Sequence, residues 1–181
     1  MPVSTWRSTS SPKDHSGNRR TGAWRAYTLL LFPQLVLFGQ SLQLQLSSAK
    51  ASAGKVVTIQ LSLTSPVGHE PLALQWETTF PADQLIPVEG GPLLGTAAWA
   101  AGKDVTCAAR PRTGNTSGSK CIVIGGQQPI HNGVIAWLRF RVLPEARRSS
   151  VRVRVEGMAV SRDLKQAPLN VAEAVVQIRS K

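Results

Sequence analysis

The sequence is poor in several residue types that would point directly to a function. It has only two cysteines and three histidines among 181 residues, and they are too scattered to form a metal-ligand set. Charged residues make up 17% of the chain, and no apolar run reaches the roughly 20 residues that a membrane-spanning helix needs. A long coiled coil and a multi-pass membrane protein are therefore excluded, and no metal or other cofactor is expected.

Recognisable catalytic motifs are also missing. The chain has no Gly-x-Ser-x-Gly turn for a serine nucleophile, no Cys-x-x-Cys pair and no Asp-rich calcium loop. Asp83, Asp104 and Asp163 are single acids in turns, whereas a glycosidase needs two positioned carboxylates. We therefore expect a protein that is not an enzyme, with a small hydrolase as a third-ranked alternative.

Acidic residues are scarce relative to basic ones. The chain holds 10 aspartates and glutamates against 21 lysines and arginines, a net charge of +11. Residues 1–41 contribute five basic residues and one acidic residue, so the remainder carries +7. This charge favours anionic partners without specifying one. Nucleic acid is not expected, because no recognition motif is present and the N-terminus indicates export.

The N-terminal segment has the layout of a secretory signal. Residues 1–26 are polar and basic, residues 27–38 are apolar, and Gly39-Gln40-Ser41 offers small residues at a cleavage site. We expect residues 1–41 to be a signal peptide cleaved after Ser41, and the protein to be secreted, periplasmic or attached to the cell envelope. The alternative is a retained membrane anchor, which would be the protein's only contact with a membrane. The long basic region is also compatible with a later start codon.

The rest of the chain, residues 42–181, reads as a series of short strands. Apolar and polar residues alternate with a period of two, which is typical of strands with one buried face. The expected strands cover residues 42–46, 57–63, 72–80, 85–89, 105–109, 121–124, 134–142, 151–155 and 174–178. One helical turn is expected within residues 93–101, and a mobile polar loop over residues 110–120. This pattern predicts a single all-β domain, an antiparallel sandwich or jelly roll of about nine strands.

The two cysteines lie at the two ends of the expected loop. Their number is even and the context indicates export, so we expect a disulfide between Cys107 and Cys121. Such a bridge closes a loop of about 15 residues and is worth roughly 3 kcal/mol in the chain-entropy model. A structural bridge is favoured over a redox role.

Four segments of the chain match the strand motifs of one known family of β-sandwich modules. Residues 54–63 resemble the family's early G-x-x-V-x-V-x-L strand. Residues 73–85 resemble the strand that ends in Y-D-P-x-x-L, with Phe80 at the tyrosine position. Residues 133–142 resemble the G-x-I-A-x-I-x-F-x-V strand, and residues 155–163 with the Val-rich strand after them resemble the family's ending. In these four segments the chain resembles cohesin domains, the receptor modules of cellulosomes and related surface assemblies. The resemblance covers residues 42–181 and implies a nine-stranded jelly-roll sandwich, similar to a class of carbohydrate-binding modules.

Cohesin domains are not enzymes, and they bind dockerin modules through one flat sheet face. The resemblance therefore implies an exported, non-catalytic binding module for a dockerin-type protein module or a polysaccharide, in a polysaccharide-handling or surface-assembly setting. The motifs place six side chains on the binding face: Gln75, Glu77, Thr79, Trp137, Arg139 and Arg141. The alternation within the two strands turns the same six side chains outward.

Trp137, flanked by Arg139 and Arg141, is the most prominent candidate contact. Trp and Arg are enriched among interface hot spots, and Trp can also stack on sugar rings. The alternative is an outer-face Trp covered by a loop, beside solvated arginines. Glu77 is expected to pair with one of these arginines, at about 0–1 kcal/mol for an exposed pair.

Two further alternatives remain open at this point. Arg139 and Arg141 form a basic stripe with Arg152 and Arg154 if their strands adjoin, which suits phosphate or an acidic glycan. Otherwise the alternating charged residues keep a sheet face solvated and discourage aggregation through the sheet edge. The second functional hypothesis is a structural adhesion or pilus-type envelope module that assembles by pairing of edge strands.

Overall fold

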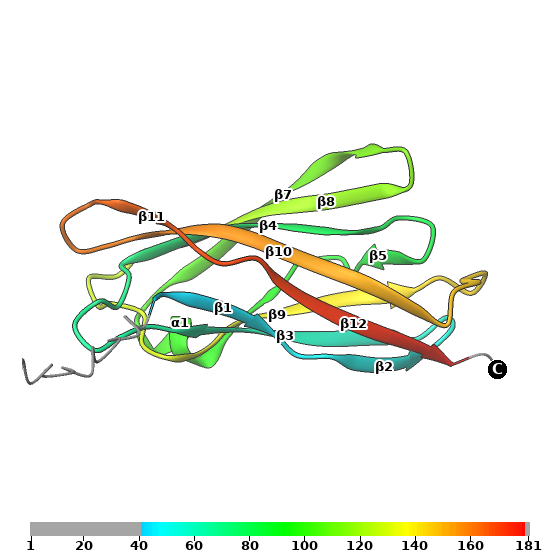
Figure 1. Ribbon diagram of the computed structural model, residues 1–181, viewed down its shortest axis with the longest axis horizontal. Helices are drawn as coiled ribbons and strands as arrows, with labels where there is room; N and C mark the ends of the chain where they lie inside the picture. Colours follow the sequence, from blue (N-terminus) through cyan, green and yellow to red (C-terminus); the bar gives the residue numbers. More distant parts are fainter. Residues whose placement is uncertain (1–40, 180–181) are drawn as a thin grey trace, which may run out of the picture. The chain divides into compact units, whose positions relative to one another are not determined.

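The computed structural model describes residues 41–179 of the chain. These residues form two β-sheets packed face to face, with one short helix (Figure 1). The prediction of an all-β sandwich is confirmed. The signal-peptide and anchor predictions fall on residues that lie outside the described part, apart from Ser41. Within that part, no helix has the length and apolar character needed to cross a bilayer.

The smaller sheet, sheet A, has the strand order β1-β3-β9-β5, and β6 also pairs with β9. Its pairings are all antiparallel. The strands are β1 (Gln43–Leu46), β3 (Val56–Thr64), β5 (Leu85–Pro87), β6 (Leu93–Leu94) and β9 (Gly133–Val142).

The larger sheet, sheet B, has the order β2-β12-β10-β4-β8-β7, and β11 pairs with β10. The strands are β2 (Ala49–Ser52), β4 (Ala73–Pro81), β7 (Asp104–Thr113), β8 (Thr116–Ile124), β10 (Ser150–Val160), β11 (Gln166–Pro168) and β12 (Ala172–Arg179). Among the strands of residues 41–179, only β2 and β12 run parallel. The sequence pattern missed β2, β6 and β11, because none of these short strands has large apolar side chains alternating with polar ones.

The core lies between the two sheets and is made by the inward side chains of each strand. In β3 the residues alternate strictly between exposed and buried up to Leu61, as the sequence pattern predicted. Trp76 of β4 is 1% exposed and occupies the space beside Gly157 of β10, where a Cβ would collide with the Gln75 carbonyl oxygen. Helix α1 (Thr96–Ala100) confirms the expected helical turn.

Strand β9 departs from simple alternation at its start. Opposite Leu61 and Ser62 of β3 the register skips one residue, so Ile135 is an extra residue in β9. Ile135 and Ala136 are consequently both buried, although strict alternation over the expected strand 134–142 turns Ile135 outward on the same side as Trp137. A bulge of this kind inserts one residue and bends the strand, and periodicity alone does not reveal it.

The expected mobile loop over residues 110–120 is wrong. Strands β7 and β8 continue through this segment and are joined by a two-residue turn at Gly114-Asn115 (Figure 1). The outer part of the hairpin is polar on both faces because it projects beyond the packed core, with residues 108–116 all exposed. Gly-Asn between two extended runs is a hairpin signal that the polar composition concealed.

The predicted disulfide is confirmed. Cys107 of β7 and Cys121 of β8 are direct cross-strand partners, with Cα atoms 4.1 Å apart, and are joined through their sulfur atoms. Cys121 is 1% exposed, so the bridge lies on the core side of the hairpin. It therefore fixes the hairpin where β7 has only one strand neighbour.

Two polar side chains hold connecting segments against the sandwich. Asn170, just before β12, accepts a hydrogen bond from Leu44 N and donates one to Leu44 O, at 2.6 and 2.9 Å. This links the start of β1 in sheet A to a segment of sheet B. Lys103 is 3% exposed and donates from Nζ to the carbonyl oxygens of Gly125 and Gly126, at 2.5 and 3.1 Å. Burial lowers the pKa of Lys103.

Candidate functional site

The six predicted face residues lie on two different sheets. Gln75, Glu77 and Thr79 are on β4 in sheet B, whereas Trp137, Arg139 and Arg141 are on β9 in sheet A. The two strands face each other across the core, where the rings of Phe80 and Phe140 have centroids 5.0 Å apart. Side chains that alternate with these rings point away from each other. The expectation of a single face made from all six residues is therefore wrong.

The alternative of a basic stripe, which required the two strands to adjoin, is excluded for the same reason. Arg139 and Arg141 belong to sheet A, while Arg152 and Arg154 belong to β10 in sheet B. Arg152 and Arg154 do not add to any surface shared with the β9 arginines. Each instead lies near a glutamate of its own sheet: Arg152 Nη1 is 4.0 Å from Glu173, and Arg154 Nη2 is 3.1 Å from Glu156.

Glu77 pairs within sheet B and not with the β9 arginines, which corrects the expected pair. Its carboxylate accepts a hydrogen bond from Arg110 of β7, and its other oxygen is 4.0 Å from Nζ of Lys120 on β8. On the neighbouring strand β10, the cross-strand partner of Glu77 is Glu156, on the same face of the sheet. The two cations offset the repulsion that two opposed carboxylates would otherwise cause.

We call the outer surface of β10, β4, β8 and β7 the β4 face. Its side chains form cross-strand rows, because residues that are Cα partners point to the same side of a sheet. One row contains Arg154, Thr79, Gly118 and Arg110, and the next contains Glu156, Glu77, Lys120 and Ala108. The face thus presents alternating charges that are already paired with each other.

Apolar side chains lie beside these charged rows. A third row contains Met158, Gln75, Ile122 and Thr106. Met158 is 37% exposed, and Ile124 at the end of β8 is 47% exposed. A shallow hollow of about 240 Å³ is bordered by Gln75, Lys120 and Ile122. The face can therefore offer both ion pairing and a recess for an apolar side chain.

The outer surface of sheet A, here called the β9 face, has a different character. Trp137 is half-buried between its Cα partners Gln60 of β3 and Leu93 of β6, and Leu93 is 50% exposed. Arg139 donates to the Glu89 carbonyl oxygen at 3.4 Å. The outward residues of β1 and β3 are mostly neutral and polar: Gln43, Gln45, Thr58, Gln60, Ser62 and Thr64.

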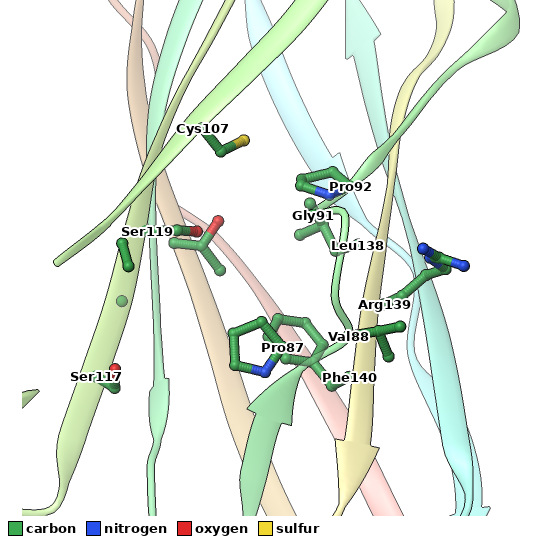
Figure 2. Close-up of a pocket in the computed structure, with 13 residues that line it drawn as sticks. Pro87, Val88, Gly91, Pro92, Cys107, Ser117, Ser119, Leu138, Arg139 and Phe140 are labelled. Carbon is green, nitrogen blue, oxygen red and sulfur yellow. The ribbon is translucent and has the colours of Figure 1, made fainter.

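A groove of about 270 Å³ opens between the two sheets, at the edge formed by β5 and the β7–β8 hairpin. Figure 2 shows Pro87, Leu138 and Phe140 on one side and Cys107 and Ser119 on the other. The buried hydroxyl of Thr78, which also lines the groove, has no hydrogen-bond partner among the described residues.

One exposed aromatic residue was missed by the sequence analysis. Trp99 on α1 is 74% exposed, although tryptophan is usually well covered in a folded domain. The segment around it, residues 96–101, is otherwise small residues, and that contrast was the available signal. Among residues 41–179, no group of three or more His, Cys, Asp or Glu side chains is placed to hold a metal ion.

Comparison with solved structures identifies the fold. No protein-family model matches the chain, and no curated protein matches it in sequence. The OlpA cohesin from Clostridium thermocellum, solved with a dockerin, has a TM-score of 0.63 at 11% identity, covering 77% of this chain and 100% of that one. The sixth cohesin of scaffoldin B from Acetivibrio cellulolyticus, solved with a Cel5 dockerin, gives 0.61 at 13% identity, with the same two coverages.

A cohesin from outside the cellulosome has the same architecture. The non-cellulosomal cohesin from the archaeon Archaeoglobus fulgidus has a TM-score of 0.55 at 14% identity, covering 78% of this chain and 93% of that one. The chain therefore contains a cohesin-like domain, and the family resemblance seen in its strand motifs is confirmed at the level of the fold.

Proposed function

We propose that the domain is a non-catalytic receptor that binds a dockerin-type protein module through the β4 face. The observation that supports the partner is the cohesin-like fold, since two of the similar cohesins were solved with dockerins. The fold also supports a binding role over an enzymatic one, because these similar structures are cohesin modules. Export and a polysaccharide-handling or surface-assembly setting belong to the same proposal.

The choice of face rests on its size and its openness. Four neighbouring strands of about nine residues, spaced about 4.8 Å apart and rising about 3.3 Å per residue, span on the order of 15 by 30 Å. That flat area, about 450 Å², supplies a little over half of the roughly 800 Å² per partner of a standard interface. Gln75, Glu77 and Thr79 are only partly exposed and lie near its centre, between β10 and β8.

The chemistry of the face suits a protein partner. Glu77 is held by Arg110 and Lys120, so its position is set before any partner arrives. A preorganised charged centre lowers the cost of ordering side chains on binding. Ile122 and Met158 beside it provide apolar contact, and the hollow next to Gln75 can receive a side chain. The expected partner carries complementary charges around one apolar anchor.

The β9 face supports a second candidate, binding of a polysaccharide. Trp137 is a partly exposed aromatic residue among glutamine, serine and threonine side chains, which can hydrogen-bond to sugar hydroxyls. This proposal retains Trp137, Arg139 and Arg141 as contact residues. It requires a ligand different from the one assigned to the β4 face.

Assembly by edge-strand pairing is less well supported. The outer half of the edge strand β7 carries Arg110, Pro111 and Arg112, and its register with β8 shifts between Arg110 and Thr113. Proline and charged side chains on an edge strand, together with an irregular ladder, discourage the addition of another strand.

The test is a binding assay with a panel of dockerin-type modules and one variant on each face. Glu77→Lys reverses the central charge of the β4 face, and we expect it to weaken binding at least about tenfold, since it loses two cationic partners and repels them instead. Trp137→Ala on the β9 face is the matched control and should change the affinity less than about twofold.

Other results would redirect the proposal. Loss of dockerin binding in Trp137→Ala, with Glu77→Lys unaffected, would move the protein interface to sheet A. Binding of neutral polysaccharides that depends on Trp137 would establish the second candidate. If the correctly folded protein binds neither the dockerin-type modules nor polysaccharides, both candidate functions are contradicted. A structural envelope module that assembles by strand pairing then becomes the leading hypothesis.

A further inference from the structure

Six exposed cations gather at one end of the sandwich, which we call the basic end. They come from strand ends and from the turn between β9 and β10, at the right of Figure 1. The residues are Lys50, Lys55, Arg141, Arg147, Arg148 and Arg179. They are spread over 130 residues of sequence, so no local run of basic residues indicates this cluster.

Backbone hydrogen bonds hold these segments together. Val142 N donates to the Lys55 carbonyl oxygen at 2.9 Å, which places Lys55 beside the end of β9. Ala53 N donates to the Arg179 carbonyl oxygen at 3.4 Å, which joins the end of β12 to the turn after β2. Arg148 N donates to Oε1 of Gln84, which attaches the β9–β10 turn to the turn after β4. The cations therefore sit on a fixed framework.

The basic end concentrates the net charge of the domain. Residues 41–179 contain fifteen lysines and arginines and nine acidic residues, a net charge of +6. The six cations of the basic end are accompanied there by two acidic residues, Glu145 and Asp83, so this end carries +4. Within the described residues, none of the six cations forms an ion pair, whereas Arg110, Arg152 and Arg154 of sheet B each lie near a glutamate. Their charge is thus available to a ligand.

The residue types indicate the class of ligand. Four of the six cations are arginines, whose planar guanidinium groups bind carboxylates and sulfates through two parallel hydrogen bonds. No exposed aromatic residue lies at this end in the described part of the chain, so the base-stacking contacts of single-stranded nucleic acid are lacking. Among residues 41–179, this end also has no amphipathic helix that could insert into a bilayer.

We propose that the basic end binds an anionic polysaccharide, through carboxylate or sulfate groups repeated along the polymer. The site is separate from the β4 face and from Trp137, and it does not depend on a dockerin partner. A linear polyanion can meet several arginines at once, and release of its counterions makes the affinity strongly dependent on salt. The domain could then hold a protein module and an acidic glycan at the same time.

The experiment measures binding of the purified chain to heparin and to polygalacturonate at 50 and 300 mM NaCl. The test variant is R147Q/R148Q/R179Q, and the matched control R112Q/R162Q/K165Q removes the same charge from other parts of the surface. We expect the test variant to lose about tenfold or more in affinity and to show a shallower salt dependence, and the control to lose less than about twofold. A second variant, K50Q/K55Q, provides the same comparison if the first is poorly folded by circular dichroism.

Three results would overturn the proposal. Equal losses in the test variant and the control would show that total charge, and not the basic end, drives binding. Absence of binding to both glycans at 50 mM NaCl would contradict the site directly. Tighter, basic-end-dependent binding to single-stranded DNA or to phosphatidylserine vesicles would replace the glycan by that other class of polyanion. Dockerin binding, measured in the same variants, should be unchanged.

Discussion

Phe80 of β4 and Phe140 of β9 meet in the core, with ring centroids 5.0 Å apart and ring planes inclined by 59°. The two rings come from opposite sheets, and both are at most 3% exposed. Their contact fixes which surfaces the neighbouring residues can occupy. The side chains that alternate with Phe80 form the β4 face, and those that alternate with Phe140 form the β9 face.

The Phe80–Phe140 contact predicts a coupled loss of stability. Phe80→Ala and Phe140→Ala should each lower the free energy of unfolding by about 3–5 kcal/mol, because each removes a large buried ring. The double variant should lose about 0.5–1.5 kcal/mol less than the sum, since an aromatic pair interacts beyond its buried area. Urea unfolding of the four proteins measures the difference. Strict additivity would mean that the rings do not interact.

Most of the fold could be predicted from the sequence, because strict alternation marks each long strand and its buried side. The even number of cysteines and the position of the expected strands were enough for the disulfide. The alternation of apolar and polar residues does not indicate which of the two sheets a strand belongs to. Strands β4 and β9 show the same period of two, and only their pairing partners distinguish them. For that reason the inward and outward residues of β4 were assigned correctly while the combined face was not.

Irregularities in the strands were the other limit of the sequence pattern. The extra residue at Ile135 reverses the alternation over one step, and nothing in the residue types marks it. The outer half of the β7–β8 hairpin is polar on both sides, so the pattern resembled a loop. The six cations of the basic end come together only through tertiary hydrogen bonds, and a linear scan for basic runs does not find them.

Removal of the disulfide should destabilise the domain. In C107A/C121A we expect the free energy of unfolding to fall by about 2–4 kcal/mol, because the bridge restricts the unfolded chain. Reduction of the unmodified protein with dithiothreitol provides the control and should give a similar loss. Urea titration measures both. A denaturation midpoint that stays the same in both cases would show that strand pairing alone holds the hairpin.

Lys103 should be important for stability although it has no acidic partner within the described residues. In Lys103→Met the carbonyl groups of Gly125 and Gly126 lose their donor, and leaving a buried acceptor unsatisfied costs about 1–3 kcal/mol. Lys165→Met, an exposed lysine on the β10–β11 turn, is the control and should have a smaller effect. Thermal unfolding followed by circular dichroism compares them. Equal melting temperatures would contradict the role assigned to the Lys103 hydrogen bonds.

Asp163 should titrate at an unusually low pH. Its carboxylate accepts hydrogen bonds from Lys165 and Ser161, at 2.7 and 2.5 Å, and these lower its pKa from 3.8 to about 2. The Asp163 carboxyl group therefore binds its proton less tightly in the folded state than in the unfolded chain. The resulting contribution to stability is fully present above pH 3.8 and disappears as the pH falls toward about 2. NMR titration of the carboxyl carbon checks the value.

Asp163→Asn tests the same site without relying on the titration. In this variant the free energy of unfolding should depend less on pH between pH 4 and pH 2, because the asparagine side chain does not ionise and the contribution of Asp163 is lost. Glu156→Gln, on the neighbouring part of β10, is a suitable comparison. A carboxyl midpoint near pH 4 in the unmodified protein would show that the Lys165 and Ser161 hydrogen bonds do not persist in solution.

The parallel pairing of β2 with β12 determines how the domain responds to a pulling force. Ala49, Lys50, Ala51 and Ser52 lie beside Val176, Gln177, Ile178 and Arg179. When the two ends of the described chain are pulled apart, parallel strands are drawn in opposite directions along their length. Their hydrogen bonds are then loaded together in shear and cannot open one after another. Ala53 N donates to the Arg179 carbonyl oxygen, and backbone N–H groups alternate sides along a strand, so Ala51 also faces β12. Single-molecule pulling should record a higher rupture force for the intact domain than for a variant with Ala51→Pro, which removes the Ala51 N–H from this ladder.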